Sequence, residues 1–323
     1  MKITETQLAQ WSEMGAKQVV FEGAKAVLKK HPNAIFLSAD VGCRFSLDRL
    51  EEIAPGHYLD VGISEQTLIG MAAGLAAEGF LPFAVAYSPF VTARVLDQVR
   101  VACGAMNLKM VILGADAGLS AGDLGPALTA LGDNGNMRTV PNLNVVEPAD
   151  CGEIIKAMVG AADAEGPTFI RIVGGPNQPM LHEEDFSFTL GKARLEKAGT
   201  DGAFIAAGPI LKECLEAAEL LENQGLSFSV VNMHTIKPLD QEMLQELSTL
   251  PAVVTVEEHT SMGGLGSAVA EYYAPLRRRP RQLICSAGDR YYPSDVRRNN
   301  LIRACLDAES LCAAVLRFLR EEA

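Results

Sequence analysis

The chain has 323 residues, a formal net charge of −12, and a composition that is 48% hydrophobic and 21% charged. These values are typical of a folded protein, and at roughly 150 residues per domain the length predicts two domains. The acidity argues against a nucleic-acid or membrane-surface binder, because both of those partners are anionic. The basic run at residues 277–279 is interpreted as a solvated turn.

Short apolar runs alternate with longer amphipathic stretches along the whole chain. This pattern predicts an α/β fold with two domains, each a mainly parallel sheet flanked by helices. In the first half, strands are expected at residues 34–39, 83–87, 110–113, 144–146 and 168–173, and helices at 64–78, 90–103 and 149–162.

The rhythm breaks at residues 174–202, where glycine, proline and polar residues predict a long connection. Beyond it, strands are expected at 203–207, 227–231 and 252–256, and helices at 210–224, 240–248, 263–273 and 301–321. The predicted domains are therefore residues 1–190 and 195–323.

Targeting segments and cysteine-based sites are not expected. Residues 1–11 are polar and lack the apolar centre of a signal peptide, and no uninterrupted apolar stretch reaches membrane-spanning length. The seven cysteines include no CxxC pair, which argues against a zinc site or a disulfide framework. The sequence predicts a reduced, cytoplasmic protein with no metal cluster and no membrane partner.

The most informative segment is residues 58–66, YLDVGISEQ. It predicts a strand that runs into Gly62, followed by Ser64 as the N-cap of a helix that begins at Glu65. From spacing alone, two interpretations of Glu65 stay open: it complements the helix dipole, or it works as a functional acid. Farther on, Tyr87 and Phe90 are three residues apart and could form either an aromatic wall or part of the core.

These segments belong to a longer series of blocks in a fixed order. The blocks are DVGISEQ (60–66), AAGLAAEG (72–79), the spacing Tyr87, Phe90, Arg94 and Asp97-Gln98, MRTVPNLNVVEPAD (137–150), GPTFIRI (166–172), TIKPLD (235–240) and VTVEEHTSMGGLGSAVAE (254–271). Together they resemble the C-terminal half of the transketolase-like thiamine diphosphate enzymes over nearly the whole chain. The resemblance implies a pyrimidine-binding domain at 1–190 and a transketolase C-terminal domain at 195–323.

The resemblance also implies roles for individual residues. Glu65 matches the glutamate that hydrogen-bonds N1′ of the cofactor's aminopyrimidine and favours its imino tautomer. Phe90 and Tyr87 match the aromatic residues that pack on the pyrimidine, with Phe83 close behind them. Asp40 matches an aspartate that reaches the cofactor across the subunit interface. The implied reaction transfers a two-carbon ketol unit from a ketose donor to an aldehyde acceptor.

The chain departs from the family at the diphosphate end of the cofactor. The family binds Mg²⁺ and the diphosphate through a Gly-Asp-Gly motif, and no such motif occurs in this sequence. The resemblance therefore implies a separate N-terminal subunit that carries the Mg²⁺ ligands, in an α2β2 assembly with this chain.

The substrate-facing loop departs as well. Asp116 and Leu128 stand where the family has histidines, and Leu124 stands where it has an aspartate. Gly174 falls near the position of an arginine that holds the substrate phosphate. We expect either an atypical ketose, such as a modified or sulfonated sugar, or replacement of the lost groups by other residues. The candidate substrate-binding residues are Arg44, His57, Asp116, Asp123 and Arg171.

Two other functions are considered. The chain could be the β subunit of a 2-oxo acid dehydrogenase E1-type enzyme, which shares the two-domain layout and the glutamate. It could also be a regulatory subunit without catalysis, as the altered loop suggests, although the pyrimidine-facing residues argue against this. The acidic pair Glu257-Glu258 and His259 are interpreted as structural or interfacial.

Overall fold

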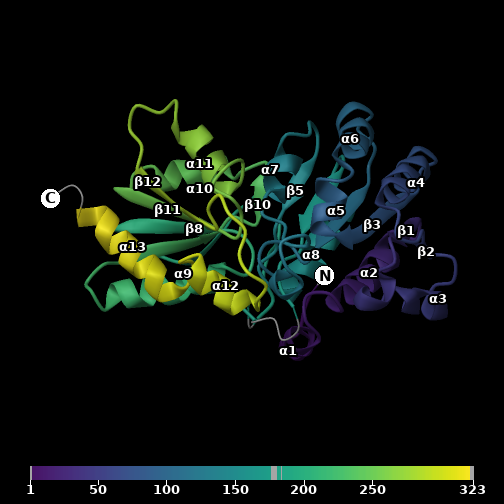
Figure 1. Cartoon of the computed structure of the whole chain (residues 1–323), viewed down its shortest axis with the longest axis horizontal. Helices are drawn as coiled ribbons and strands as arrows, with labels where there is room; N and C mark the ends of the chain where they lie inside the picture. The colour runs from purple at the N-terminus through teal and green to yellow at the C-terminus, as the bar shows by residue number, and fades with distance from the viewer. Residues whose placement is uncertain (1, 176–179, 183, 321–323) are drawn as a thin grey trace.

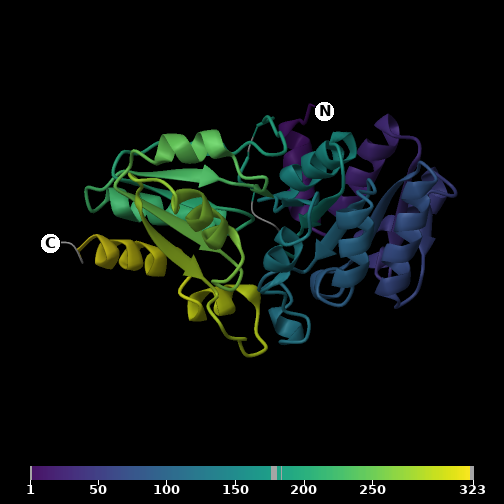
Figure 2. The ribbon, with the colours of Figure 1, turned by 90° about the horizontal axis from the view of Figure 1, so that it is seen from above.

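A computed structural model describes residues 2–175, 180–182 and 184–320. Within these ranges the strands form two sheets that stand side by side in separate lobes (Figures 1 and 2). The predicted α/β class, with two mainly parallel sheets flanked by helices, is confirmed. None of the helices in the described ranges is both long enough and apolar enough to cross a membrane.

The first sheet has seven strands, of which six come from the first half of the chain. Their order is β10 (Thr235–Lys237), β5 (Asn144–Val146), β6 (Thr168–Arg171), β4 (Val111–Ala115), β3 (Leu81–Tyr87), β1 (Ala34–Ser38) and β2 (Tyr58–Asp60). All pairs are parallel except β10 with β5. Since β10 belongs to the second half of the chain, backbone hydrogen bonds join the two halves directly.

Helices cover both faces of this sheet. The α-helices of the first half are α1 (Glu5–Met14), α2 (Val19–Lys30), α3 (Leu50–Ile53), α4 (Glu65–Ala77), α5 (Ser88–Thr92), α6 (Leu96–Val99), α7 (Asp133–Arg138) and α8 (Cys151–Asp163). Shorter turns are the 3₁₀ segments Gly42–Phe45, Leu47–Arg49 and Gly122–Leu124, and the π-helical segment Arg100–Ala105.

The second sheet has five strands in the order β12 (Arg281–Ser286), β11 (Ala252–Glu257), β8 (Gly202–Ala206), β9 (Phe228–Asn232) and β7 (Arg194–Lys197). Only β7 runs antiparallel to its neighbour. In Figure 1, α10 (Gln241–Leu247) and α11 (Leu265–Tyr273) lie on one side of this sheet, and α9 (Leu211–Glu222), α12 (Arg297–Arg303) and α13 (Ala308–Arg320) lie on the other.

The packed core is continuous across the two lobes. One buried cluster contains Met137 and Val145 from the first half together with Met233, Ile236 and Leu244 from the second half. Two further clusters fill the α2–α8 side of the first sheet and the α9–α13 side of the second. The lobes therefore share buried apolar surface, which keeps their relative position fixed.

The structure differs from the predicted elements in several places, among them α1, α2, α3 and α7, for which no helix was predicted. The single helix expected at 90–103 is divided into α5, α6 and the π-helical segment. The helix expected at 301–321 is two helices, because the chain turns at Cys305, which has a positive φ of 55°; Glu321 lies outside the described residues. The short strands β7, β10 and β12 were not predicted, since their few residues carry polar side chains that hide the apolar pattern of a strand.

A buried charged cluster holds the connection between the lobes in place. Residues 176–179 and 183 of this connection lie outside the described residues. Asp150 caps α8 by accepting from the Glu153 backbone N–H at 2.8 Å. The ring of His182 donates to Asp150 through Nδ1 at 2.8 Å and to Glu196 through Nε2 at 3.3 Å. Burial alone would lower the pKa of His182, but these two carboxylates raise it to about 9.

The cluster predicts a specific pH dependence of stability. Because the pKa of His182 is higher in the folded chain than in the unfolded one, its stabilisation is complete below about pH 6.5 and is lost as the pH rises toward 9. We expect His182→Gln to flatten the decline in unfolding free energy over this interval, measured by urea denaturation at several pH values. His31→Gln, which changes a partly exposed histidine paired with Asp163, should leave the decline intact. Parallel curves for wild type and His182→Gln would contradict the prediction.

Candidate functional site

Glu65 lies at the N-terminus of α4, just beyond the carboxyl end of β2, and only 5% of it is exposed. Ser64 is the N-cap residue as predicted, but its hydroxyl donates to the Val61 carbonyl at 2.9 Å instead of capping the helix. Glu65 Oε2 accepts a hydrogen bond from Arg94 Nη1 at 2.8 Å. The carboxylate is thus engaged by a side chain from another segment.

Tyr87 and Phe90 form an aromatic wall beside Glu65. Tyr87 ends β3 and Phe90 lies in α5, and their rings meet edge to face with centroids 6.3 Å apart. Arg94 lies over the Phe90 ring at 4.0 Å, and Arg44 lies over the Tyr87 ring at 6.0 Å. The structure therefore brings Glu65, Tyr87 and Phe90 together, with one guanidinium over each ring.

Asp60, the first residue of the DVGISEQ block, supports this arrangement, although no individual role was predicted for it. Its carboxylate accepts from the Ser38 hydroxyl at 2.5 Å, the Tyr58 hydroxyl at 3.0 Å, the Gly62 N–H at 2.7 Å and the Asp40 N–H at 3.2 Å. Partial burial would raise the pKa of Asp60, but these hydrogen bonds lower it. The ionised carboxylate ties the ends of β1 and β2 to the turn that leads into α4.

Asp40 and Arg44 follow the carboxyl end of β1. Asp40 is exposed, with a positive φ of 58°, and Arg44 is exposed on the adjoining 3₁₀ segment. Gly42 allows this segment to lie close to β2, since a Cβ at that position would be 1.8 Å from the Tyr58 hydroxyl. In parallel sheets, the carboxyl ends of the strands are where ligands bind.

The substrate-loop candidate Asp116 faces the same region. It is 4% exposed and pairs with Lys17 Nζ at 2.7 Å. Burial raises the pKa of Asp116, while the charges of Lys17 and Arg44 oppose that rise. Asp123 lies exposed on a neighbouring 3₁₀ segment, and its negative charge adds to the rise. Sequence reasoning missed Lys17, because 99 residues of chain separate it from Asp116.

Two predicted site residues have other roles in the structure. Phe83 is fully buried and stacks on Phe36 with centroids 4.8 Å apart, within the core on the α2 side of the sheet. His57 precedes β2, where its Nδ1 contacts the Ala34 carbonyl at 2.8 Å. This is the amino end of the strands, opposite to Asp40 and Glu65, because β1 and β2 are parallel. The structure thus places Phe83 in the core and His57 at the edge of the sheet opposite to Glu65, so neither lies with the other proposed site residues.

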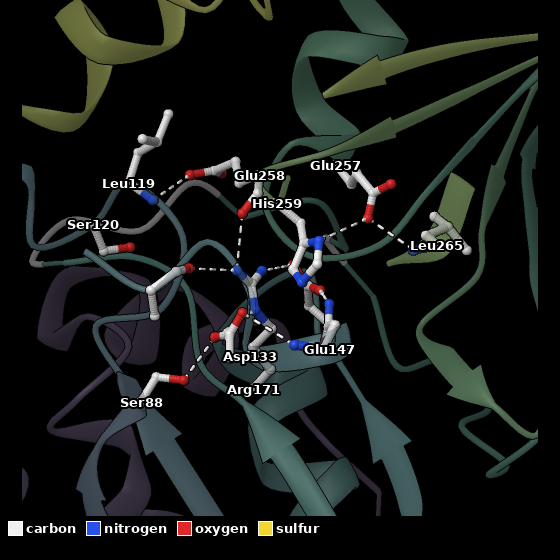
Figure 3. A network of polar contacts seen from close by, with 12 residues as sticks. Ser88, Leu119, Ser120, Asp133, Glu147, Arg171, Glu257, Glu258, His259 and Leu265 are labelled. Atoms are coloured by element: carbon white, nitrogen blue, oxygen red, sulfur yellow. Dashed lines mark hydrogen bonds and ion pairs between the residues drawn. The ribbon is translucent and has the colours of Figure 1, made fainter. Parts of the chain in front are cut away.

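Arg171, the last predicted substrate residue, is also placed elsewhere. It ends β6 with no exposed surface, and its guanidinium bonds Asp133 at 2.9 Å and Glu147 at 2.6 Å (Figure 3). Its remaining nitrogen donates to the carbonyls of Ala130 at 3.2 Å and Glu258 at 2.8 Å. Each guanidinium nitrogen therefore has a protein partner, and Arg171 lies at the junction between the lobes.

The groups around Arg171 are themselves held by both lobes. Glu258 pairs with Arg297 and accepts from the Leu119 N–H at 3.3 Å. Glu257 accepts from the Leu265 and Gly266 N–H groups at the start of α11. His259 Nε2 accepts from the Gly135 N–H at 3.2 Å. Figure 3 shows Glu257, Glu258 and His259 approaching the Arg171 junction, and their contacts fit the structural or interfacial interpretation of residues 257–259.

Comparison with known proteins identifies the family. Residues 13–173 match the transketolase pyrimidine binding domain, and residues 191–297 match the transketolase C-terminal domain. The 6-deoxy-6-sulfo-D-fructose transketolase subunit SqwH of Clostridium sp. (strain MSTE9) is 39% identical over 77% of this chain and 79% of its own length.

Two further relatives place the chain within that family. A solved structure described as a split gene transketolase, inactive beta4 tetramer, superposes with a TM-score of 0.84 at 30% identity, over 94% of this chain and 97% of its own. The 1-deoxy-D-xylulose-5-phosphate synthase of Parasynechococcus marenigrum (strain WH8102) is 34% identical over 75% of this chain. The match spans only 38% of the length of that synthase.

The Arg171 junction predicts a large loss of stability on substitution. Arg171→Met removes the cation and leaves Asp133 and Glu147 buried without their partner, which should lower the unfolding free energy by about 3–5 kcal/mol. Arg171→Lys, which keeps the charge but loses the planar fork, should lose less. Arg100→Met removes an exposed arginine paired with Asp97 and should change the free energy by less than about 1 kcal/mol. Equal denaturation midpoints for Arg171→Met and Arg100→Met would contradict this assignment.

Proposed function

Because this chain belongs to the transketolase family, we propose that it is the C-terminal subunit of a split, thiamine diphosphate-dependent transketolase. In this proposal it transfers a two-carbon ketol unit from a ketose donor to an aldehyde acceptor. The observation that carries the proposal is the grouping of a buried carboxylate, Glu65, with the aromatic wall of Tyr87 and Phe90. A carboxylate at the edge of an aromatic face suits a flat heterocycle that needs one fixed hydrogen bond.

The residues of the proposed site in this chain fit the pyrimidine end of thiamine diphosphate. Glu65, Tyr87 and Phe90 match the pyrimidine end, whereas the sequence contains no Gly-Asp-Gly motif for the diphosphate and Mg²⁺. Among the described residues, Glu153, His182 and Glu196 have ligand atoms close enough to share a metal ion. They lie at the junction of the lobes and bond one another or neighbouring groups. We therefore assign the Mg²⁺ ligands to a partner subunit.

Exposed apolar side chains near Glu65 support a partner subunit. Ile63 precedes α4 and is 76% exposed, and Leu59 of β2 and Met71 of α4 are also exposed; Phe80 is exposed beyond the far end of α4. Along α4, Gly70 and Gly74 have open space in front of them. Clustered exposed apolar groups mark protein interfaces. We propose that an N-terminal subunit covers this face and completes the site in an α2β2 assembly.

Thiamine diphosphate, when bound, supplies the carbanion chemistry that amino-acid side chains lack. The chain's own residues bind and orient its pyrimidine ring. Glu65 Oε2 provides the fixed hydrogen-bonding carboxylate, and its burial excludes water that would compete for the same atom. Tyr87 and Phe90 fix the plane of the ring. The Asp60 hydrogen bonds hold the turn that carries Glu65, so the carboxylate is oriented before the ring arrives.

We further propose that the ketose carries an anionic group, a sulfonate or a phosphate. The relative SqwH is named for a sulfonated fructose, and Arg44 offers a cation beside the aromatic wall. Among the described residues, no carboxylate lies within ion-pair distance of Arg44, so its guanidinium is available to a substrate. Lys17 pairs with Asp116 and adds a second cation to the region.

The synthase match favours a second candidate reaction, the formation of a 1-deoxy sugar phosphate. The two reactions give different products, since ketol transfer keeps a hydroxyl on C1 and a 1-deoxy sugar has a methyl group there. Proton NMR of the reaction mixture separates them. We favour ketol transfer, because the split transketolase structure matches the chain over nearly its full length.

Glu65→Gln tests the proposed catalytic site. In the complex reconstituted with the N-terminal subunit, we expect ketol transfer to fall by about 100-fold or more, because an amide cannot hold or share the proton as a carboxylate does. Glu78→Gln, at the opposite end of α4, should keep full activity, and the chain without its partner should have none. Unchanged turnover by Glu65→Gln, or full activity of the isolated chain, would refute the proposal.

Arg44→Ala tests the anionic substrate. We expect KM for sulfonated or phosphorylated ketoses to rise about tenfold while KM for uncharged ketoses stays constant, because a charge-assisted contact is lost. Arg49→Ala is the matched control, since Arg49 lies nearby in sequence but over Phe21 of α2. An equal change in KM for charged and uncharged donors would show that Arg44 does not recognise the anion.

A further inference from the structure

Arg94 makes two contacts at once, and both are with residues of the proposed pyrimidine site. Its Nη1 donates to Glu65 Oε2 at 2.8 Å, and its guanidinium carbon lies 4.0 Å from the centroid of the Phe90 ring. Arg44 lies over Tyr87, but in the described residues it makes no such bond to a carboxylate. Of the two guanidinium groups on the aromatic wall, Arg94 is therefore the one that both stacks and donates.

These contacts are the ones that the proposed function assigns to the aminopyrimidine. A guanidinium is a flat, nitrogen-rich group that stacks on aromatic faces and donates hydrogen bonds in its own plane. A pyrimidine ring that stacked at the guanidinium's position on Phe90 and bonded to Glu65 Oε2 would take over both of these contacts. Both groups cannot occupy this position together.

Electrostatics explains why the unliganded chain needs such a group. Glu65 is 5% exposed, and a buried carboxylate without a partner is costly. Arg94 supplies the partner from the turn between α5 and α6, so the charge is compensated before any cofactor is present. The Arg94 side chain is itself 46% exposed, so its guanidinium can turn into water without crossing the core.

Resting on the proposed function, we propose that Arg94 holds the place of the cofactor's pyrimidine ring in the free chain and leaves it when the ring binds. The ion pair with Glu65 and the stacking on Phe90 are then lost during binding, which makes cofactor binding weaker than the aromatic wall alone would allow. Arg94 is a positioning residue: its bond to Oε2 holds the Glu65 carboxylate oriented toward the wall until the ring replaces it.

Cofactor affinity tests the proposal with a definite sign. Thiamine diphosphate is titrated by calorimetry, with Mg²⁺, into the complex of this chain with the N-terminal subunit. We expect Arg94→Ala to bind about three- to tenfold more tightly than wild type, since the competing ion pair and stacking are absent. Arg94→Lys keeps the charge but not the flat group, and its affinity should fall between the two.

Arg100→Ala is the matched control for charge. Arg100 lies a short distance along the chain, pairs with the exposed Asp97, and does not contact Glu65. Loss of a positive charge should weaken the binding of an anionic diphosphate if it has any effect. Tighter binding by Arg94→Ala alone therefore cannot arise from a general electrostatic change.

The free chain gives a readout that does not depend on the cofactor. Arg94→Ala and Glu65→Gln should each shift the denaturation midpoint, and the double variant should shift it by less than the sum, because both remove the same contact. A wild-type complex that binds no thiamine diphosphate would overturn the proposed function. A wild-type complex that binds it, with Arg94→Ala binding equally or more weakly, would overturn only the role of Arg94, as would additive shifts in the free chain.

Discussion

The structure depends on the neutralisation of one buried cation, Arg171, at the junction of the lobes. Its charge is out of reach of water, so Asp133 and Glu147 must stay beside it, and burial alone would lower its pKa while these two carboxylates raise it. Burial also raises the pKa of Glu147 to about 7, because Arg171 only partly offsets the loss of water. Arg171 also donates to the Glu258 carbonyl, so satisfying its buried guanidinium requires the second lobe as well. The relative position of the lobes is therefore a condition for compensating this charge.

The same junction holds the loop that faces the proposed substrate. Residues 116–130 leave β4, and contacts with the second lobe hold them along their length. Glu258 accepts from the Leu119 N–H, and the Asp295 N–H donates to the Gly122 carbonyl. Arg171 bonds the Ala130 carbonyl at the far end. Although the second lobe contributes none of the proposed cofactor residues, it positions Asp116 and Asp123 through this loop. This gives the C-terminal lobe a physical role in a site that it does not itself form.

The site has the character of one half of a larger site. Its aromatic wall and its carboxylate lie at the carboxyl ends of β1, β2 and β3, where ligands bind in parallel sheets. Apolar groups beside it are exposed, and the buried carboxylate is compensated by the chain's own Arg94. A surface that satisfies its buried charge from within can fold on its own and, in the proposed function, still accept a ligand. In the free chain Arg94 compensates Glu65, whereas the proposed binding of the cofactor requires Arg94 to leave.

The sequence by itself determined the fold class and most strands of the first sheet, and its resemblance to a known family pointed to Glu65, Tyr87 and Phe90 as a proposed site. These are local signals: apolar periodicity, a helix start, and motifs of adjacent residues. Only the tertiary structure decided which distant groups meet. It placed Lys17 beside Asp116, moved Arg171 from the proposed substrate site to the lobe junction, put His57 at the opposite edge of the sheet and Phe83 in the core, and brought Arg94 onto Glu65. The reason is physical: periodicity reports which face of an element is buried, whereas charge pairing depends on distances between elements that only the folded chain sets.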